Sequence, residues 1–269
     1  MATNCGLTPT QVLKDSESKP TKPAAKTAAV KRTPFIMVLA VVLAAAIVGG
    51  IRAGAMSVKI GNQLDASDLA GLAVTKKDNY FTFTFGNYPQ GANGEIQPIE
   101  WRVLAVKDGR ALVISEKLLD YVPYHERYTD VTWENCTLRG WLNSDFWNEA
   151  FSGSERAKIA AVTNQNPDHP KYGTEGGSDT RDRLFALSID EAHKYFSISE
   201  SDRTAYTTDY AHAKGYDDRD RSGWWWLRSP GILSDNAAYV NCGGSVDQDG
   251  NFVYNYFGAV RPAMWLNLE

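Results

Sequence analysis

Alternating apolar and polar positions predict strands near the start of the folded part of the chain. Residues 80–85 (YFTFTF) alternate aromatic residues with threonine, while residues 99–106 (IEWRVLAV) and 111–115 (ALVIS) are two further apolar runs. The last two runs flank Asp108 and Gly109, and an Asp-Gly pair between such runs is typical of a tight hairpin turn. The pattern therefore predicts three strands, of which the last two form a hairpin.

A helical period replaces this alternation in the middle of the chain. Apolar residues recur there at three- and four-residue steps, which predicts one amphipathic helix. They are Leu138, Trp141, Leu142, Phe146, Ala150 and Phe151. Two capping boxes, Ser152-x-x-Glu155 and Ser188-x-x-Glu191, predict helices that continue through residues 159 and 196.

A polar segment and a second set of strands complete the chain. Residues 163–183 are rich in Gly and Pro, so we expect a long exposed loop, a common place for functional residues. Further short strands are expected at residues 184–187, 224–228, 237–242, 251–256 and 260–268. Strands followed by helices and then again by strands predict one α+β domain with an antiparallel sheet.

Three consecutive tryptophans lie in one of these strands (SGWWWLRSPG, residues 222–231). Successive side chains of a strand point to opposite faces, so Trp224 and Trp226 share one face and Trp225 takes the other. Because the strand is expected to lie between others, we assign Trp224 and Trp226 to the core. Trp225 is the residue that we expect to offer a contact surface.

An uncharged apolar run, FIMVLAVVLAAAIVGGI at residues 35–51, precedes the folded part. Its length approaches that of a short membrane span, and it lacks the polar stripe of a buried helix. Basic residues precede it, so the positive-inside rule places the N-terminus in the cytoplasm and the C-terminal part outside the cell. We expect a disordered cytoplasmic tail at 1–33, a cell-membrane anchor at 34–55, a linker at 56–77 and an extracellular domain at 78–269.

A cleaved signal peptide is the alternative, because Ala53-Gly54-Ala55 fits the cleavage pattern. Both alternatives export the main domain. Residues 1–33 carry six basic and two acidic groups, or +4, while the whole chain carries −4, so the remainder carries −8. An acidic main domain argues against nucleic acid as a partner.

Cysteine, histidine and aspartate patterns give little sign of a disulfide or of a metal site. Cys136 and Cys242 would both lie outside, where a disulfide can persist; the alternative is two small buried thiols. The four histidines have no ligand spacing, so we expect no zinc. Residues 247–251 (DQDGN) look like the start of a calcium loop, but Gly258 occupies the position of the essential Glu. We favour a hairpin turn there, and we expect no metal and no cofactor.

Several ordered motifs resemble a bacterial family of exported domains of unknown function. They are FGNYPQ, IEWRVLAVKDGRALVIS, TLRGWLNSDFWNEAF, WWLRSPG and VRPAMWL, and together they span about residues 80–269. The resemblance implies a C-type lectin-like fold, similar also to sulfatase-modifying-factor domains, with an antiparallel sheet and two to three helices. It brings no activity, because the reactive cysteine pair, the histidine cluster and the calcium-dependent sugar-binding motifs of relatives of that fold are missing.

Polar and aromatic residues of the C-terminal segment are the candidate ligand-binding residues, because Asn, Asp and Tyr adapt to many partners. They are, besides Trp225, Asp235, Asn236, Tyr239, Asn241, Asp247, Asp249, Asn251, Tyr254, Asn255 and Tyr256. Variation of AAC-type codons reaches the same residue types, so one hypothesis is a diversified binding segment. The alternative is a set of turn residues and strand aromatics. Arg228 and Arg261 are assigned structural roles at strand ends.

Catalytic signatures such as GxSxG, a P-loop or HExxH are missing from the sequence. Asp217, Asp218 and Asp220 alternate with arginines, which is typical of a solvated charged loop. We therefore expect a membrane-anchored, surface-exposed binding module that recognises a protein or a glycan. The alternatives are an exported enzyme with its site in the loops at 163–183 and 217–220, and a purely structural surface domain.

Overall fold

A computed structural model describes residues 58–196, 199–215 and 221–268 of the protein. The expected tail at 1–33 and the expected anchor at 34–55 lie outside these residues, as do Asp217, Asp218 and Asp220. Within the described ranges, no helix has the length and apolar character needed to cross a membrane.

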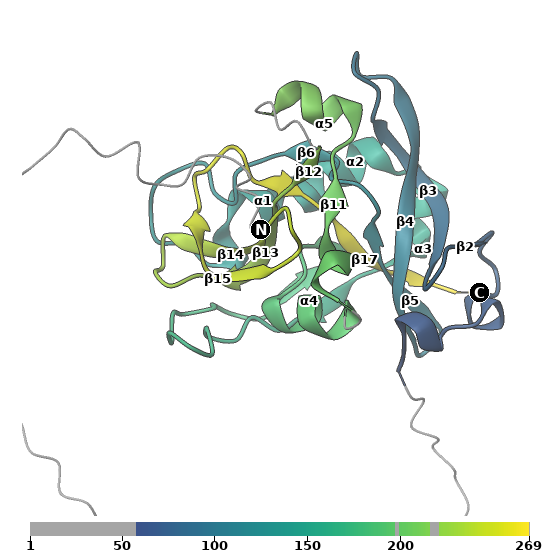
Figure 1. The fold of residues 1–269 in the computed structure, drawn as a ribbon, viewed down its shortest axis with the longest axis horizontal. Helices are drawn as coiled ribbons and strands as arrows, with labels where there is room; N and C mark the ends of the chain where they lie inside the picture. The colour runs from purple at the N-terminus through teal and green to yellow at the C-terminus, as the bar shows by residue number, and fades with distance from the viewer. Residues whose placement is uncertain (1–57, 197–198, 216–220, 269) are drawn as a thin grey trace, which may run out of the picture. The chain divides into compact units, whose positions relative to one another are not determined.

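The larger of two main sheets has eight strands (Figure 1). They follow the order β10-β17-β5-β4-β3-β2, with β1 paired to β4 and β7 paired to β17. The strands are β1 (Lys59–Ile60), β2 (Thr75–Lys76), β3 (Phe81–Pro89), β4 (Ile96–Lys107), β5 (Arg110–Ser115), β7 (Ile159–Ala160), β10 (Leu184–Phe185) and β17 (Ala263–Asn267). All these pairs are antiparallel.

The predicted hairpin forms between β4 and β5. Lys107 pairs with Arg110, and the two residues between them, Asp108 and Gly109, have φ angles of 51° and 70°. Positive φ at both central positions is the geometry of a two-residue hairpin turn, which Asp-Gly adopts readily. The Asp-Gly signal therefore identified this turn correctly.

The segment expected to be a linker belongs in part to the larger sheet. Lys59 of β1 pairs with Val106, and Thr75 of β2 pairs with Thr82. Between these strands lie two short 3₁₀ helices, η2 (Gly61–Gln63) and η3 (Ala66–Leu69). Buried Leu residues in this segment, such as Leu69, explain why it packs on the domain instead of extending away from it.

The predicted amphipathic helix forms as three consecutive helical pieces. They are α1 (Thr137–Trp141), the π-helical turn η5 (Leu142–Phe146) and α2 (Trp147–Ala150). Both capping boxes are present and begin α3 (Gly153–Lys158) and α4 (Ile189–Tyr195). In the second box the Glu191 amide donates to the Ser188 hydroxyl at 3.2 Å, and the Ser188 amide donates to the Glu191 carboxylate at 2.9 Å. The remaining helices are η4 (Trp133–Asn135), η6 (Glu200–Arg203) and α5 (Asp209–Lys214).

The smaller main sheet has five strands in the order β15-β14-β13-β16-β6. They are β6 (Asp120–Tyr121), β13 (Trp225–Pro230), β14 (Asn236–Val240), β15 (Val246–Phe252) and β16 (Ala259–Val260). The β13–β16 pair is parallel and the others are antiparallel. Two small ribbons join β8 (Val162–Asn164) to β9 (Thr180–Asp182) and β11 (Ala205–Tyr206) to β12 (Ser222–Gly223). The described residues thus form the mixed, mainly antiparallel α+β arrangement that the sequence predicted.

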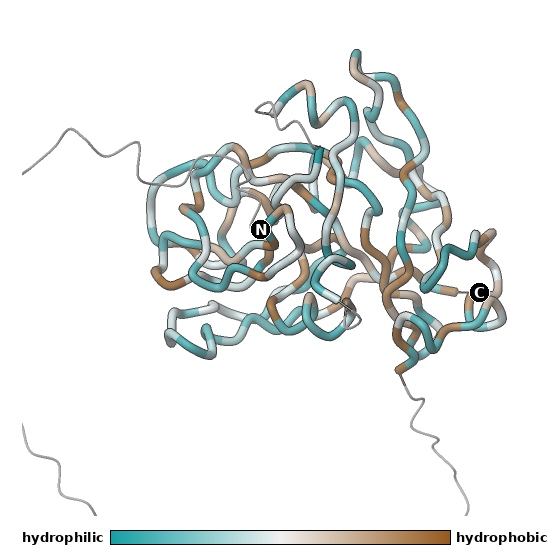
Figure 2. Tube along the Cα trace, in the orientation of Figure 1, coloured by the Kyte–Doolittle hydropathy of each residue, from teal (hydrophilic) through white to brown (hydrophobic). Residues whose placement is uncertain are grey.

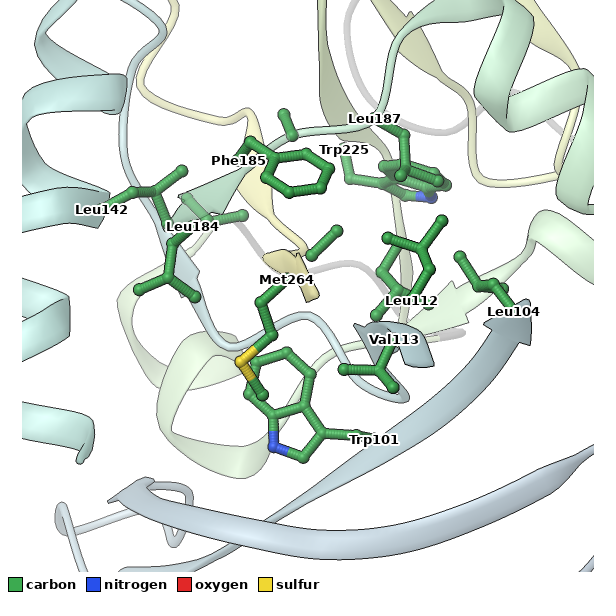
Figure 3. Close-up of a cluster of buried hydrophobic side chains, with 14 of the residues drawn as sticks. Trp101, Leu104, Leu112, Val113, Leu142, Leu184, Phe185, Leu187, Trp225 and Met264 are labelled. Carbon is green, nitrogen blue, oxygen red and sulfur yellow. The ribbon is translucent and has the colours of Figure 1, made fainter. Parts of the chain in front are cut away.

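One hydrophobic core contains side chains from both main sheets. Figure 3 shows Trp101 of β4, Met264 of β17 and Trp225 of β13 in one cluster of buried side chains. In Figure 2 hydrophobic positions concentrate along the inner strands, while the outer loops are largely hydrophilic. Burial of this apolar surface is the main force that holds the two sheets together.

The last hairpin differs from its prediction. The expected turn at 247–251 and the expected strand at 251–256 are wrong: residues 246–252 form β15, and the turn lies at residues 241–245. Asn241 explains the shift, because its side-chain oxygen accepts from the amides of Gly243 at 2.9 Å and Ser245 at 3.1 Å. The Asp-Gly pair lies instead in an irregularity of β15, where Gly250 has a φ of 83°.

Candidate binding surface

Two residues of the tryptophan run, Trp225 and Trp226, lie inside the domain and offer no contact surface. Trp225 is 0% exposed, and its indole N–H donates to the Arg203 carbonyl at 3.2 Å. Trp226 is buried as expected and donates to the Val122 carbonyl at 3.1 Å. Strand β13 has a neighbouring strand on each side and packing on both faces, so alternation does not expose Trp225. Its expected role in ligand contact is therefore wrong, and the half-buried Trp224 is the most accessible of the three.

Both arginines of the sequence motifs make the contacts of structural residues. Arg228 is buried, pairs with Glu191 and donates to the Ala186 carbonyl at 3.0 Å. Arg261 is buried and donates to the carbonyls of Ser115 at 2.9 Å and Arg203 at 3.0 Å. Burial lowers the pKa of Arg261 to about 10. Each guanidinium therefore joins segments that lie far apart in the sequence.

Several candidate polar residues hold turns and bulges rather than facing outward. Asn241 forms the turn described above, and Asp247 accepts from the Gly250 amide at 3.1 Å and from the Tyr239 hydroxyl at 2.9 Å. Asn255 accepts from the Phe257 amide at 2.9 Å and donates to Asn251 at 3.2 Å. These residues therefore fit the alternative hypothesis, in which they form turns, better than the hypothesis that they contact a ligand.

Exposed aromatic rings gather beside the edge strand β15. Tyr254 follows β15 and is 36% exposed, and it touches Tyr128, which is 67% exposed. The rings of Tyr128 and Tyr254 are 5.2 Å apart at 74°, and Tyr128 lies 5.9 Å from Phe252 at 77°. Phe252 and Tyr254 are 5.7 Å apart. We call Tyr128, Phe252 and Tyr254 the ring cluster.

Other exposed hydrophobic side chains lie on segments next to the ring cluster. They are Ile232, Leu233, Tyr256 and Phe257. Soluble proteins seldom expose so many large apolar side chains on neighbouring segments unless the surface binds something.

Tyr128 joins the cluster through backbone hydrogen bonds at both ends of its segment. The His125 amide donates to the Val253 carbonyl at 2.7 Å, and the Val131 amide donates to the Ser234 carbonyl at 3.0 Å. The sequence interpretation missed Tyr128, which lies more than 100 residues from these partners. The only signal was local: a single aromatic residue within the charged run HERYTD.

Two polar residues at the ring cluster have oxygen atoms without a hydrogen-bond donor among the described residues. They are the Oδ1 atoms of Asp235 and Asn236, both covered by protein. Asn236 is 8% exposed and is the cross-strand partner of Phe252, so the two side chains share a face of the sheet. The Tyr128 hydroxyl donates to Asp235. Two covered acceptors without a donor among the described residues therefore belong to residues that neighbour Tyr128 and Phe252 of the ring cluster.

The long loop at 163–183 is partly buried, contrary to the expectation of an exposed loop. Its hub is Asp182, whose side chain is buried and accepts from Trp133 at 3.1 Å, Arg139 at 2.6 Å, Asn164 at 3.0 Å and Thr180 at 2.7 Å. These four donors satisfy the carboxylate, which explains how a polar loop packs against the core.

The tip of this loop contacts the strand that carries the ring cluster. Tyr172 donates to Asp249 of β15, and Thr174 donates to the Ile232 carbonyl at 3.0 Å. His169 is buried, and its Nδ1 accepts from the amides of Lys171 at 3.1 Å and Tyr172 at 3.2 Å. The loop thereby supports the edge of the smaller sheet.

Cys136 and Cys242 are both buried and free, so the alternative of two buried thiols describes the structure and the possible disulfide is not formed. Burial raises the pKa of the Cys136 thiol to about 12, and its sulfur accepts from the Arg139 amide at the start of α1. No group of three His, Cys, Asp or Glu side chains in the described part of the chain is arranged to hold a metal ion. Asp247 and Asp249 are engaged in the contacts given above.

These observations describe an α+β domain with an exposed aromatic cluster beside its edge strand β15. A protein family described as Domain of unknown function (DUF6273) matches residues 108–268, more than half of the chain. The protein belongs to this family. No curated protein and no solved structure shows significant similarity to the chain. The family match begins at the β4–β5 turn; it includes the smaller main sheet, the ring cluster and strands β5, β7, β10 and β17 of the larger sheet, but not β1 to β4.

Proposed function

We propose that the folded domain is a surface-exposed ligand-binding module that recognises a protein or a glycan. Residues 34–55 would anchor it in the cell membrane, with the domain outside the cell. The observation that carries the proposal is the ring cluster, which exposes Tyr128 and Tyr254 beside unpartnered acceptors. Rigid aromatic side chains supply contact area at little entropic cost, which is why binding surfaces use them.

The proposed fold class supports this function. The mixed, mainly antiparallel sheets and short helices are compatible with a C-type lectin-like domain, as the WWLRSPG and VRPAMWL motifs implied. We include this similarity in the proposal. An experimental structure that superimposes on a C-type lectin-like domain would support it, and a different order of strands would contradict it.

Diversification of the C-terminal segment remains part of the proposal in a narrower form. Of the candidate residues, Asp249, Tyr254 and Tyr256 are exposed, while Asn241 and Asn255 are needed for turns. Variation that alters a ligand contact would therefore concentrate at the first three. A neighbouring reverse-transcriptase gene with a near-copy of this segment would support diversification, and the lack of both would remove it.

Catalysis is the weaker alternative, because the carboxylates that it would use are engaged elsewhere. Asp182 has four hydrogen-bond donors, and the depression of ≈ 490 Å³ beside β3 and β4 contains one carboxylate, Glu100. Glu100 lies 3.3 Å from Lys77 in an ion pair. Among the described residues, neither the surroundings of Asp182 nor this depression brings a nucleophile together with an acid–base pair.

The test compares ligand binding by the full-length protein with binding by two variants. The probes are a glycan array and a pull-down of cell-surface proteins. We expect Tyr128→Ala combined with Tyr254→Ala to weaken binding at least about tenfold. Tyr206→Ala is the matched control, since Tyr206 is exposed on β11 away from the ring cluster. Equal binding by the double variant, or no ligand in either assay, would contradict the proposal.

A further inference from the structure

The ring cluster lies among acidic and acceptor groups. Asp235 holds the Tyr128 hydroxyl, and the charges that act on this hydroxyl include those of Asp235 and the exposed Asp130. The pKa of Tyr128 is raised, first by its hydrogen bond to Asp235 and then by the charge of that carboxylate. The neighbouring Arg127 acts on His125 and lowers the pKa of that imidazole, after the larger effect of burial. Asp235 and Asp130 therefore make the potential beside the Tyr128 hydroxyl more negative.

Covered acceptor atoms strengthen this potential. Asn236 is more than nine-tenths buried, shares a sheet face with Phe252 and has an Oδ1 atom without a donor among the described residues. The Oδ1 atom of Asp235 is likewise covered and has no donor among the described residues. A buried acceptor without a donor is energetically unfavourable, and electrostatic effects extend further through protein than through water. Both oxygens thus favour a positive group at the adjacent surface.

We propose that the ligand is a protein and that it presents an arginine side chain to the ring cluster, with the guanidinium over the tyrosine rings and beside Asp235. This inference rests on the proposed binding function and names its ligand chemistry. A guanidinium stacks on aromatic faces and offers five donors, which suits rings that border several acceptors. The exposed Ile232 and Leu233 add aliphatic surface, which favours a polypeptide over a sugar.

A random peptide library tests the proposal and does not require the natural partner to be identified first. Peptides are selected on the immobilised full-length protein and counter-selected on the Tyr128→Ala, Tyr254→Ala double variant. We expect arginine to be enriched at one position of the selected peptides. Replacing that arginine by citrulline, a neutral residue of the same shape, should weaken binding at least about tenfold.

Asp235→Asn is the charge variant, because it keeps the shape of the side chain. It should weaken binding of the arginine peptide at least about tenfold and leave binding of the citrulline peptide unchanged. Asp145→Asn, at an exposed aspartate of η5, is the matched control and should change neither. Circular dichroism melting of each variant checks that the fold is retained.

The outcomes separate the inference from the function on which it rests. Selected peptides that lack a required arginine and ignore Asp235→Asn would overturn the inference and leave the binding function in place. The same conclusion follows if a glycan, but no peptide, depends on the ring cluster. If no peptide and no glycan depends on Tyr128 and Tyr254, both proposals fail.

Discussion

Two aromatic groups of the smaller sheet have opposite environments. Trp225 and Trp226 lie on β13, between β14 and β16, and both are buried. Phe252 lies on the edge strand β15, with the exposed Tyr128 and Tyr254 beside it. The sequence drew attention to the tryptophans because three stand in a row, yet the accessible rings belong to the less conspicuous group.

Position in the sheet explains this difference better than residue type does. A central strand is covered by neighbours at both edges, and here also on both faces, so β13 buries side chains on both faces regardless of alternation. An edge strand has one free side, where a loop such as the Tyr128 segment can attach and remain exposed. Aromatic density in a sequence therefore predicts a core or a surface only after the order of the strands is known.

Removal of a buried tryptophan should have the largest effect on stability. Trp225→Ala leaves a cavity and removes one of the two donors to the Arg203 carbonyl, so we expect the free energy of unfolding to fall by about 3–5 kcal/mol. Urea unfolding followed by circular dichroism measures this change. Tyr254→Ala is the control from the exposed group and should shift the melting temperature by less than about 2 °C. Similar losses in the two variants would refute the comparison.

The buried hub of the long loop should behave like the core although it is polar. Asp182→Ala removes the acceptor of four donors, so we expect a loss of about 3 kcal/mol in the free energy of unfolding. The expected loss of about 3 kcal/mol allows for the partial exposure of Arg139, one of the four donors. Glu175→Ala, at an exposed residue of the same loop, should leave stability unchanged. If Asp182→Ala left the free energy of unfolding unchanged, the Asp182 carboxylate would not be what holds the loop in place.

Lowering the pH should destabilise the fold through His169, which lies in the loop that supports the ring cluster. We expect this effect to be smaller than that of Asp182→Ala. Burial lowers the pKa of His169 in the folded protein, so the unfolded chain binds the proton first as the pH falls. Stability is therefore retained above about pH 6.5 and decreases below it. The urea midpoint between pH 8 and pH 5 measures this, and His169→Gln should make its pH dependence shallower. His125 remains in the variant and retains a slope of the same sign, since burial lowers its pKa too. An unchanged slope would exclude His169 as the cause.

Local signals in the sequence predicted local structure well. The Asp108-Gly109 turn and both Ser-x-x-Glu boxes form as expected, because each depends on residues within a few positions of one another. The second Asp-Gly pair misled the prediction, since the side chain of Asn241 forms the turn six residues earlier than the sequence suggested.

Contacts between distant segments could not be predicted in the same way. Tyr128 reaches Tyr254 only because its segment bonds to residues 234 and 253, and nothing near Tyr128 in the sequence encodes those partners. Likewise, the burial of Trp225 depends on which strands flank β13, and the parallel pairing with Ala259 of β16 has no local signature. The accessibility of Trp225 and of Tyr128 therefore depends on pairings between distant segments that the local sequence does not encode.

The segment that carries Tyr128 has a consequence for how this family can evolve. Its backbone is fixed at His125 and at Val131, and the side chains of residues 127–130 between them are exposed. Under the proposed binding function, sequence changes in these four residues would alter what the surface recognises while the core keeps its packing. The stretch would then be a segment that selection or an engineer can exchange to give the same scaffold a new specificity.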